Sequence, residues 1–146
     1  MGTNHNARGN DSAARALSRC PIPWAKHEAA NAANPCVNQL IDVAGFEGYG
    51  RYWRLFELLL ADASHSVPHR DEQGYKRYMF GLGFADAESF ETFLGLLLDL
   101  DLIRTDESGR RCIAAVEDAA LAYGQRRYNG GKGGTQAAQN RRAIKF

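Results

Sequence analysis

The stretch GFEGYGRYWRLFELLLAD, residues 45–62, places three glycines at the entrance of a segment rich in bulky apolar side chains. Beyond Gly48 these side chains recur at helical spacing and form one broad stripe, made of Tyr49, Tyr52, Trp53, Phe56, Leu59 and Leu60. A stripe this wide predicts a mostly buried helix at the centre of a domain. The glycines then have a structural interpretation. Gly45 ends a preceding helix, and Gly48 and Gly50 let the two helices press against each other.

The segments around this stretch continue the helical pattern. Asn34 followed by a proline is a typical helix start, so we expect a short helix over residues 34–44. Residues 64–68 should be extended, because proline disfavours helix in the residue before it. Asp71 is predicted to cap a further helix, which closes at Gly83.

The pattern changes after residue 100. Asp86 is predicted to cap a helix over 86–99, and residues 102–105 and 111–115 are typical of two strands joined by a turn. A last helix is expected over 116–128. The order of elements from Gly48 is that of a mostly α winged helix-turn-helix with a small β-hairpin as the wing, one extra helix before it and one after.

Composition and charge place the chain among globular proteins. Of its 146 residues, 45% are hydrophobic and 24% charged, and no apolar run is long enough to span a bilayer. No signal peptide is recognisable near Met1, so we expect a cytoplasmic protein without membrane contact. The cysteines have no metal-ligand spacing and are predicted to be free thiols; they are Cys20, Cys36 and Cys112.

The charge is unevenly distributed along three predicted regions. Residues 1–23 are expected to form a disordered arm, residues 24–128 the winged-helix domain, and residues 129–146 a basic, glycine-rich flexible tail. Residues 31–123 carry eight cations against fifteen acids, whereas residues 124–146 carry six cations and no acid. Such an acidic body with a basic end favours contact with a polyanion through that end.

One block of the sequence resembles a known family. The EGYG motif at residues 47–50, followed by Tyr52 and Trp53, is similar to the signature of phage and bacterial replication-initiation proteins (replisome organisers). His27 with Glu28, Pro35, LLLDLDLIRTDESGRRCI and RRYNGGKGG match other parts of that pattern, whereas Cys36 stands where the family commonly has a lysine. The resemblance covers roughly residues 24–134. It implies a winged-helix domain similar to the N-terminal domain of the primosome protein DnaD. Such domains bind DNA or oligomerise to help load a helicase.

The residues themselves suggest where binding could occur. The helix over 86–99 contains no cation and several acids, so it is a poor reader of bases in the major groove. Cations that could contact phosphates without sequence preference lie instead in the wing and near the basic end: Arg104, Arg110, Arg111, Arg126, Arg127, Lys132, Arg141 and Arg142. The acidic helix is better suited to a protein partner, through Glu88, Glu91, Leu96 and Leu98.

Catalytic patterns are weak. The GGKGGT segment lacks the first glycine of a phosphate-binding loop. His65 and His69 are four residues apart, but Pro68 places them in a loop rather than on one helix face, and no cluster of cysteines or carboxylates accompanies them. We therefore predict a protein that is not an enzyme and has neither cofactor nor metal. Three functions stay open: a non-specific DNA-binding accessory factor of replication initiation that works with a helicase or its loader, a protein-interaction module that forms homo-oligomers, and a winged-helix transcriptional regulator.

Overall fold

The computed structural model describes residues 5–144. They form five α-helices: α1 (His5–Ser18), α2 (Pro35–Ala61), α3 (Tyr75–Gly81), α4 (Ala87–Asp99) and α5 (Ala114–Ile144). A 3-10 turn, η1 (Ala29–Ala33), precedes α2, and a two-stranded antiparallel hairpin joins β1 (Arg104–Thr105) to β2 (Arg111–Cys112). The prediction of a mostly helical chain with a small hairpin is confirmed. The winged-helix assignment stays a prediction.

α2 is two helical stretches joined at a glycine. Gly45 has φ 66° and ψ −171°, a backbone conformation that residues other than glycine rarely adopt. At its start, the Asn34 side chain accepts a hydrogen bond from the Cys36 N–H, so the predicted cap is confirmed. The second stretch presents the predicted aromatic and leucine side chains to the interior, and Leu55 and Leu59 are fully buried.

The two glycines after Gly45 behave differently from each other. A Cβ on Gly48 would lie 2.4 Å from the Cβ of Ala44, so this position needs glycine for close packing, as predicted. A Cβ on Gly50 would meet no atom within 4 Å. The prediction that Gly50 is a packing glycine is therefore wrong, because its helix face is open at that point.

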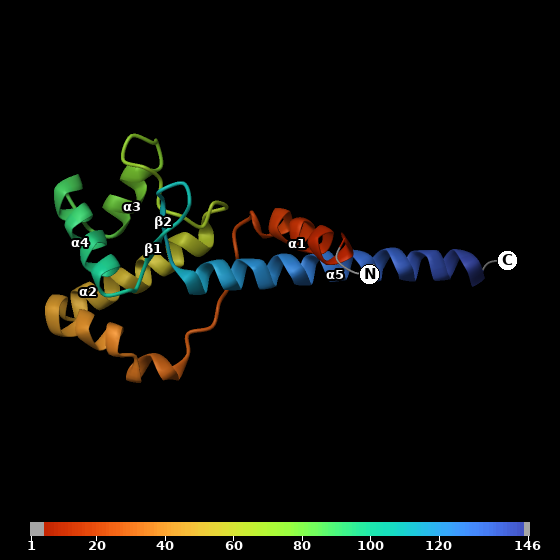
Figure 1. The fold of residues 1–146 in the computed structure, drawn as a ribbon, viewed down its shortest axis with the longest axis horizontal. Helices are drawn as coiled ribbons and strands as arrows, with labels where there is room; N and C mark the ends of the chain where they lie inside the picture. The colour runs from red at the N-terminus through yellow and green to blue at the C-terminus, as the bar shows by residue number, and fades with distance from the viewer. Residues whose placement is uncertain (1–4, 145–146) are drawn as a thin grey trace.

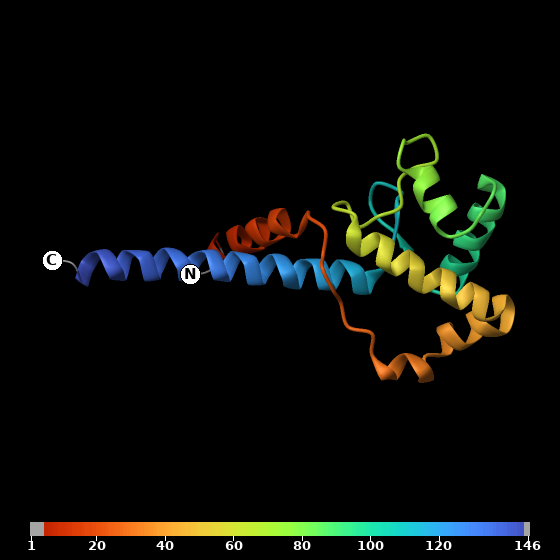
Figure 2. The same cartoon turned by 180° about the vertical axis from the view of Figure 1, so that it is seen from behind.

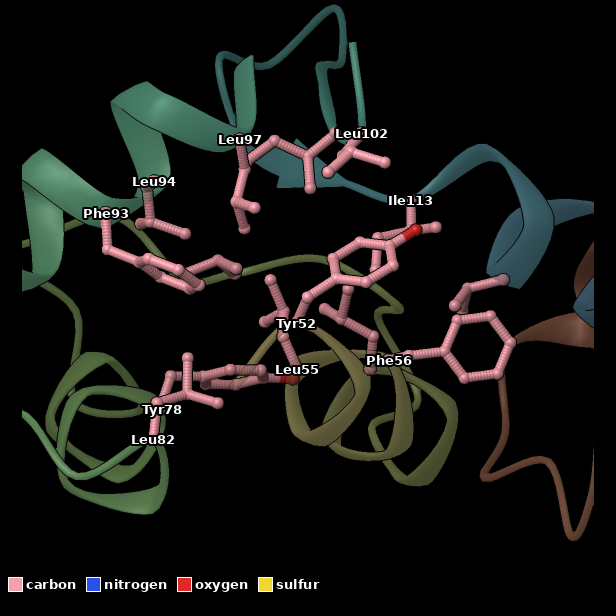
Figure 3. Close-up of a cluster of buried hydrophobic side chains, with 14 of the residues drawn as sticks. Tyr52, Leu55, Phe56, Tyr78, Leu82, Phe93, Leu94, Leu97, Leu102 and Ile113 are labelled. Atoms are coloured by element: carbon pink, nitrogen blue, oxygen red, sulfur yellow. The ribbon is translucent and has the colours of Figure 1, made fainter. Parts of the chain in front are cut away.

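The core lies between the second stretch of α2, helices α3 and α4, and the hairpin; we call this unit the body. Figure 3 shows the Tyr52 ring of α2 directed toward Ile113, which follows β2, while Leu94 and Leu97 of α4 and Tyr78 of α3 line other sides of the same cluster. The extended segment before α3 joins the hairpin, because Val67 donates a backbone hydrogen bond of 2.8 Å to the Arg111 carbonyl.

Two predicted helix caps have different outcomes. The Asp86 side chain accepts a hydrogen bond of 2.7 Å from the Ser89 N–H at the start of α4, as predicted. α3, however, begins at Tyr75, with Gly74 at its N-cap position and no side-chain cap. Asp71 lies in the preceding turns, so its predicted capping role is wrong.

The two ends of the chain depart most from expectation. α5 continues to Ile144 instead of ending near residue 128, and it projects from the body (Figure 1). Glycine lowers helix stability without forbidding helical backbone angles, so the glycines of residues 130–134 do not end the helix. Residues 5–18, predicted to be disordered, form α1, which lies along α5 in both views (Figures 1 and 2). The outermost parts of both predicted regions lie outside the described residues.

Candidate nucleic-acid interface

The arginines of the hairpin form ion pairs with carboxylates of other segments of the chain. Arg111 forms two hydrogen bonds with the carboxylate of Glu91 on α4, at 2.6 and 3.0 Å, and only 17% of its side chain is exposed. Arg110 pairs with Glu72, and Arg104 pairs with Glu117 on α5. All three predicted phosphate-binding arginines of the hairpin therefore already face a carboxylate.

The Arg111–Glu91 pair extends into a small network. The Tyr75 hydroxyl of α3 donates a hydrogen bond of 2.5 Å to Glu91. The hydrogen bonds from Arg111, together with the one from Tyr75, hold the pKa of the Glu91 carboxyl below its usual range despite partial burial. Burial and the bond to Glu91 raise the pKa of the Tyr75 phenol to about 12. The network ties α3, α4 and β2 together, which is a structural role.

The four residues predicted to contact a protein partner do not form one exposed surface. Glu88 is exposed, but Glu91 belongs to the network with Arg111. Leu96 and Leu98 are half-buried and pack against the core. The exposed polar face of α4 consists of Glu88, Ser89, Thr92 and Asp99, and thus offers no cation to base edges.

The far half of α5 is an exposed helix that carries cations and no acid. Every residue from 129 to 143 is exposed, and no acid follows Asp118 in the sequence. We call residues 126–142 of this helix the α5 arm; its cations are Arg126, Arg127, Lys132, Arg141 and Arg142. None of the five has a carboxylate partner within the part of the chain that the structure describes.

Three cations of the α5 arm have local contacts that carry no negative charge. The Arg126 guanidinium lies 5.8 Å from the Trp24 ring centroid and 5.9 Å from that of Tyr123. Arg127 donates a hydrogen bond of 3.1 Å to the Leu17 carbonyl. The Lys132 ammonium lies 4.7 Å from the Tyr128 ring centroid. These contacts orient the side chains but leave their charge unneutralised.

Helix α1 is held against the first half of α5 by a close approach. A Cβ on Gly124 would lie 2.2 Å from the Ala14 carbonyl oxygen and 2.8 Å from the Ser18 nitrogen. Only a glycine allows the two backbones to come this near. No local sequence pattern indicates this contact, because the partners are about 110 residues apart and Gly124 follows an ordinary helical pattern.

A buried histidine fastens α1 to the body. His65 is 5% exposed and adopts a positive φ of 53°. Its Nδ1 lies 2.8 Å from the Leu59 carbonyl oxygen, and its Nε2 lies 2.9 Å from the Ser18 carbonyl oxygen. The ring thus bridges the C-terminal ends of α1 and α2. Sequence reasoning considered His65 only as a metal ligand and missed this contact.

The described part of the chain contains no group of three or more histidine, cysteine, aspartate or glutamate side chains arranged to hold a metal ion. None of the described helices is long and apolar enough to cross a membrane. Comparisons with family models, with curated proteins and with solved structures found no match.

Proposed function

We propose that this chain is a DNA-associated accessory protein of replication initiation, and that it contacts nucleic acid through the α5 arm. The observation that carries the proposal is the run of five cations on a projecting helix with no acid after Asp118. Unpaired cations on an exposed helix attract a phosphate backbone and release its condensed counterions. The role in replication rests on the EGYG motif and its aromatic helix, which resemble the initiation family.

A winged-helix body fits this proposal. The second stretch of α2, followed by α3, α4 and the hairpin, has the element order of that fold. The bridge between Val67 and Arg111 adds the extended segment to the hairpin, as expected for a wing. In this body α4 would be the recognition helix, but its exposed face is acidic or neutral. Binding through the α5 arm is therefore expected to depend little on DNA sequence.

The length of the α5 arm supports contact with the phosphate backbone of a long nucleic acid. Arg126 and Arg141 are separated by roughly 22 Å along the helix axis, at 1.5 Å per residue. From residue 129 to residue 140, all side chains other than Lys132 are small or polar. A phosphate backbone could thus meet charge at both ends of the arm, and small residues between them keep the approach open.

The test is the salt dependence of DNA binding by the full-length protein. Binding of a fluorescent duplex is followed by anisotropy at several KCl concentrations. We expect the Arg141→Gln/Arg142→Gln variant to bind more weakly and to lower the slope of log K against log salt by about 2, at about 0.9 per lost phosphate contact. A matched variant, Arg54→Gln/Lys76→Gln, removes two exposed cations from the body and should leave the slope unchanged. If the wild-type protein does not bind DNA at low salt, the proposal is wrong.

A second function is supported by a different surface. Val43 and Phe46, on either side of the Gly45 break, are 66% and 78% exposed. The two side chains are three residues apart in the sequence, and a group of exposed apolar side chains is typical of a protein interface. A protein-interaction or oligomerisation module would therefore use this corner of α2 rather than α4. Sedimentation of the wild type and of a Val43→Ser/Phe46→Ser variant over a range of concentrations tests this alternative. If both remain monomeric and neither retains a helicase or loader, it is excluded.

A further inference from the structure

Trp24 is exposed where a tryptophan is unusual. Its exposed fraction is 62%, although tryptophan is among the most buried residue types on average. It lies in the segment between α1 and η1, outside the aromatic stripe of α2. An exposed indole needs an explanation in terms of either packing in the free protein or contact with a ligand.

The backbone around Trp24 is fastened on both sides. Before it, Ile22 is buried and its N–H donates a hydrogen bond of 2.8 Å to the Leu60 carbonyl. After it, the His27 ring stacks on Trp53 at a centroid distance of 3.8 Å. Pro21 and Pro23 further restrict the chain. The indole is therefore presented to solvent on a restrained segment and is not simply part of a loose end.

The neighbours of Trp24 are aromatic and cationic. The Arg126 guanidinium lies within 6 Å of both the Trp24 and the Tyr123 ring centroids. The Arg127 guanidinium lies 6.0 Å from the Tyr123 centroid. Two rings and two cations thus meet where the α5 arm begins, and neither arginine has a carboxylate partner among the described residues.

We propose that Trp24, with Tyr123 and Arg126, forms a platform on which an unpaired base of a single-stranded nucleic acid stacks, while its phosphates follow the α5 arm. The inference rests on the proposed function, because it assumes that the arm binds nucleic acid. Base-on-aromatic stacking tolerates any base and is used with cationic grooves by single-strand binding proteins. A duplex keeps its base faces stacked on one another, so it can use the cations but not the indole. An acidic peptide would satisfy the cations but leaves the two aromatic rings beside Arg126 unexplained.

The experiment uses full-length protein and three probes of equal length: oligo(dT), oligo(rU) and a DNA duplex. In the Trp53→Phe variant, Trp24 is the only tryptophan. We expect oligo(dT) to quench its fluorescence and the duplex to leave it nearly unchanged. Quenching by oligo(rU) would show that the platform accepts RNA as well as DNA.

Affinity measurements on a second set of variants make the test independent of Trp53→Phe. Trp24→Ala should weaken oligo(dT) binding about tenfold, the value of one stacked base, and should change duplex binding less than twofold. Trp24→Phe should restore most of the affinity, because it keeps an aromatic face. Phe80→Ala removes an exposed aromatic residue of α3 and should have no effect; its side chain is 60% exposed.

Two results would overturn the inference, and they differ in what they say about the proposed function. Suppose that oligo(dT) and the duplex both bind through Arg141 and Arg142, but Trp24→Ala binds oligo(dT) as the wild type does. The stacking platform is then excluded and the proposed function stands. If neither the single strands nor the duplex bind at low salt, both the stacking platform and the proposed function are excluded.

Discussion

The arginines of the hairpin and those of the α5 arm have the same chemistry but different surroundings. Arg104, Arg110 and Arg111 each pair with a carboxylate from another segment of the chain. The cations of the α5 arm have aromatic rings, a carbonyl oxygen or solvent beside them, and no carboxylate among the described residues. A cation already paired with an acid gains less from a phosphate, because the new contact must replace the old one. The comparison teaches that sequence composition identifies cations, whereas their partners decide which are available.

The largest effect is expected at the most enclosed pair of the hairpin. Replacing Arg111 with Gln leaves the partly buried Glu91 without its charged partner. We expect the free energy of unfolding to fall by about 2 kcal/mol, the usual cost of an unsatisfied buried group. Urea denaturation measures the loss, and DNA affinity should change little. Unchanged stability combined with weakened DNA binding would contradict the distinction between the two groups of arginines, because Arg111 would then contact DNA as the cations of the α5 arm do.

A somewhat smaller effect is expected at acid pH. The pKa of Glu91 is lower in the folded protein than in the unfolded chain, because Arg111 and Tyr75 bind its ionised form. The stability it contributes is therefore present above about pH 4.3, the ordinary value for glutamate, and is lost as the pH falls through the lowered folded pKa. Thermal melts measured at intervals of about one pH unit between about pH 3 and pH 7 should show this loss. Glu91→Gln should flatten the decline, and an equally steep decline in that variant would contradict the role of Glu91.

The smallest effect is expected at the exposed end of the hairpin. The Arg104 side chain is 59% exposed, so its pair with Glu117 is well solvated. Arg104→Gln should reduce the free energy of unfolding by less than about 1 kcal/mol. Urea denaturation in low and high salt tests this, since added salt should reduce the difference between variant and wild type. A loss as large as that of Arg111→Gln would show that exposure does not separate the two pairs.

The sequence predicted the helical core well because its signals are local. The aromatic stripe of α2, the Asn34 and Asp86 caps and the glycine at position 45 each act within a few residues. The spacing of apolar side chains also located α3, α4 and the hairpin. The separate roles of Gly48 and Gly50 could not be read in this way, because they depend on which helix face meets Ala44.

The candidate site was predictable only in part for the same reason. The basic end was identified from charge alone, but α1 docks on α5 at Gly124 and on the end of α2 through His65, and both contacts are distant in sequence. The ion pairs of the hairpin likewise join Arg110 to Glu72 and Arg111 to Glu91 across separate elements. Trp24 directly follows Pro23 in the sequence. Its exposure and its position beside Arg126, however, are visible only in the folded structure.

The most direct test of this account compares two double variants in the same DNA-binding assay. Arg141→Gln/Arg142→Gln removes two charges from the α5 arm, and Arg104→Gln/Arg110→Gln removes two from the hairpin. Binding of full-length protein to a duplex is measured across a range of KCl concentrations. The account predicts that the arm variant lowers the slope of log K against log salt by about 2, while the hairpin variant keeps the wild-type slope. A lowered slope in the hairpin variant and a wild-type slope in the arm variant would contradict it.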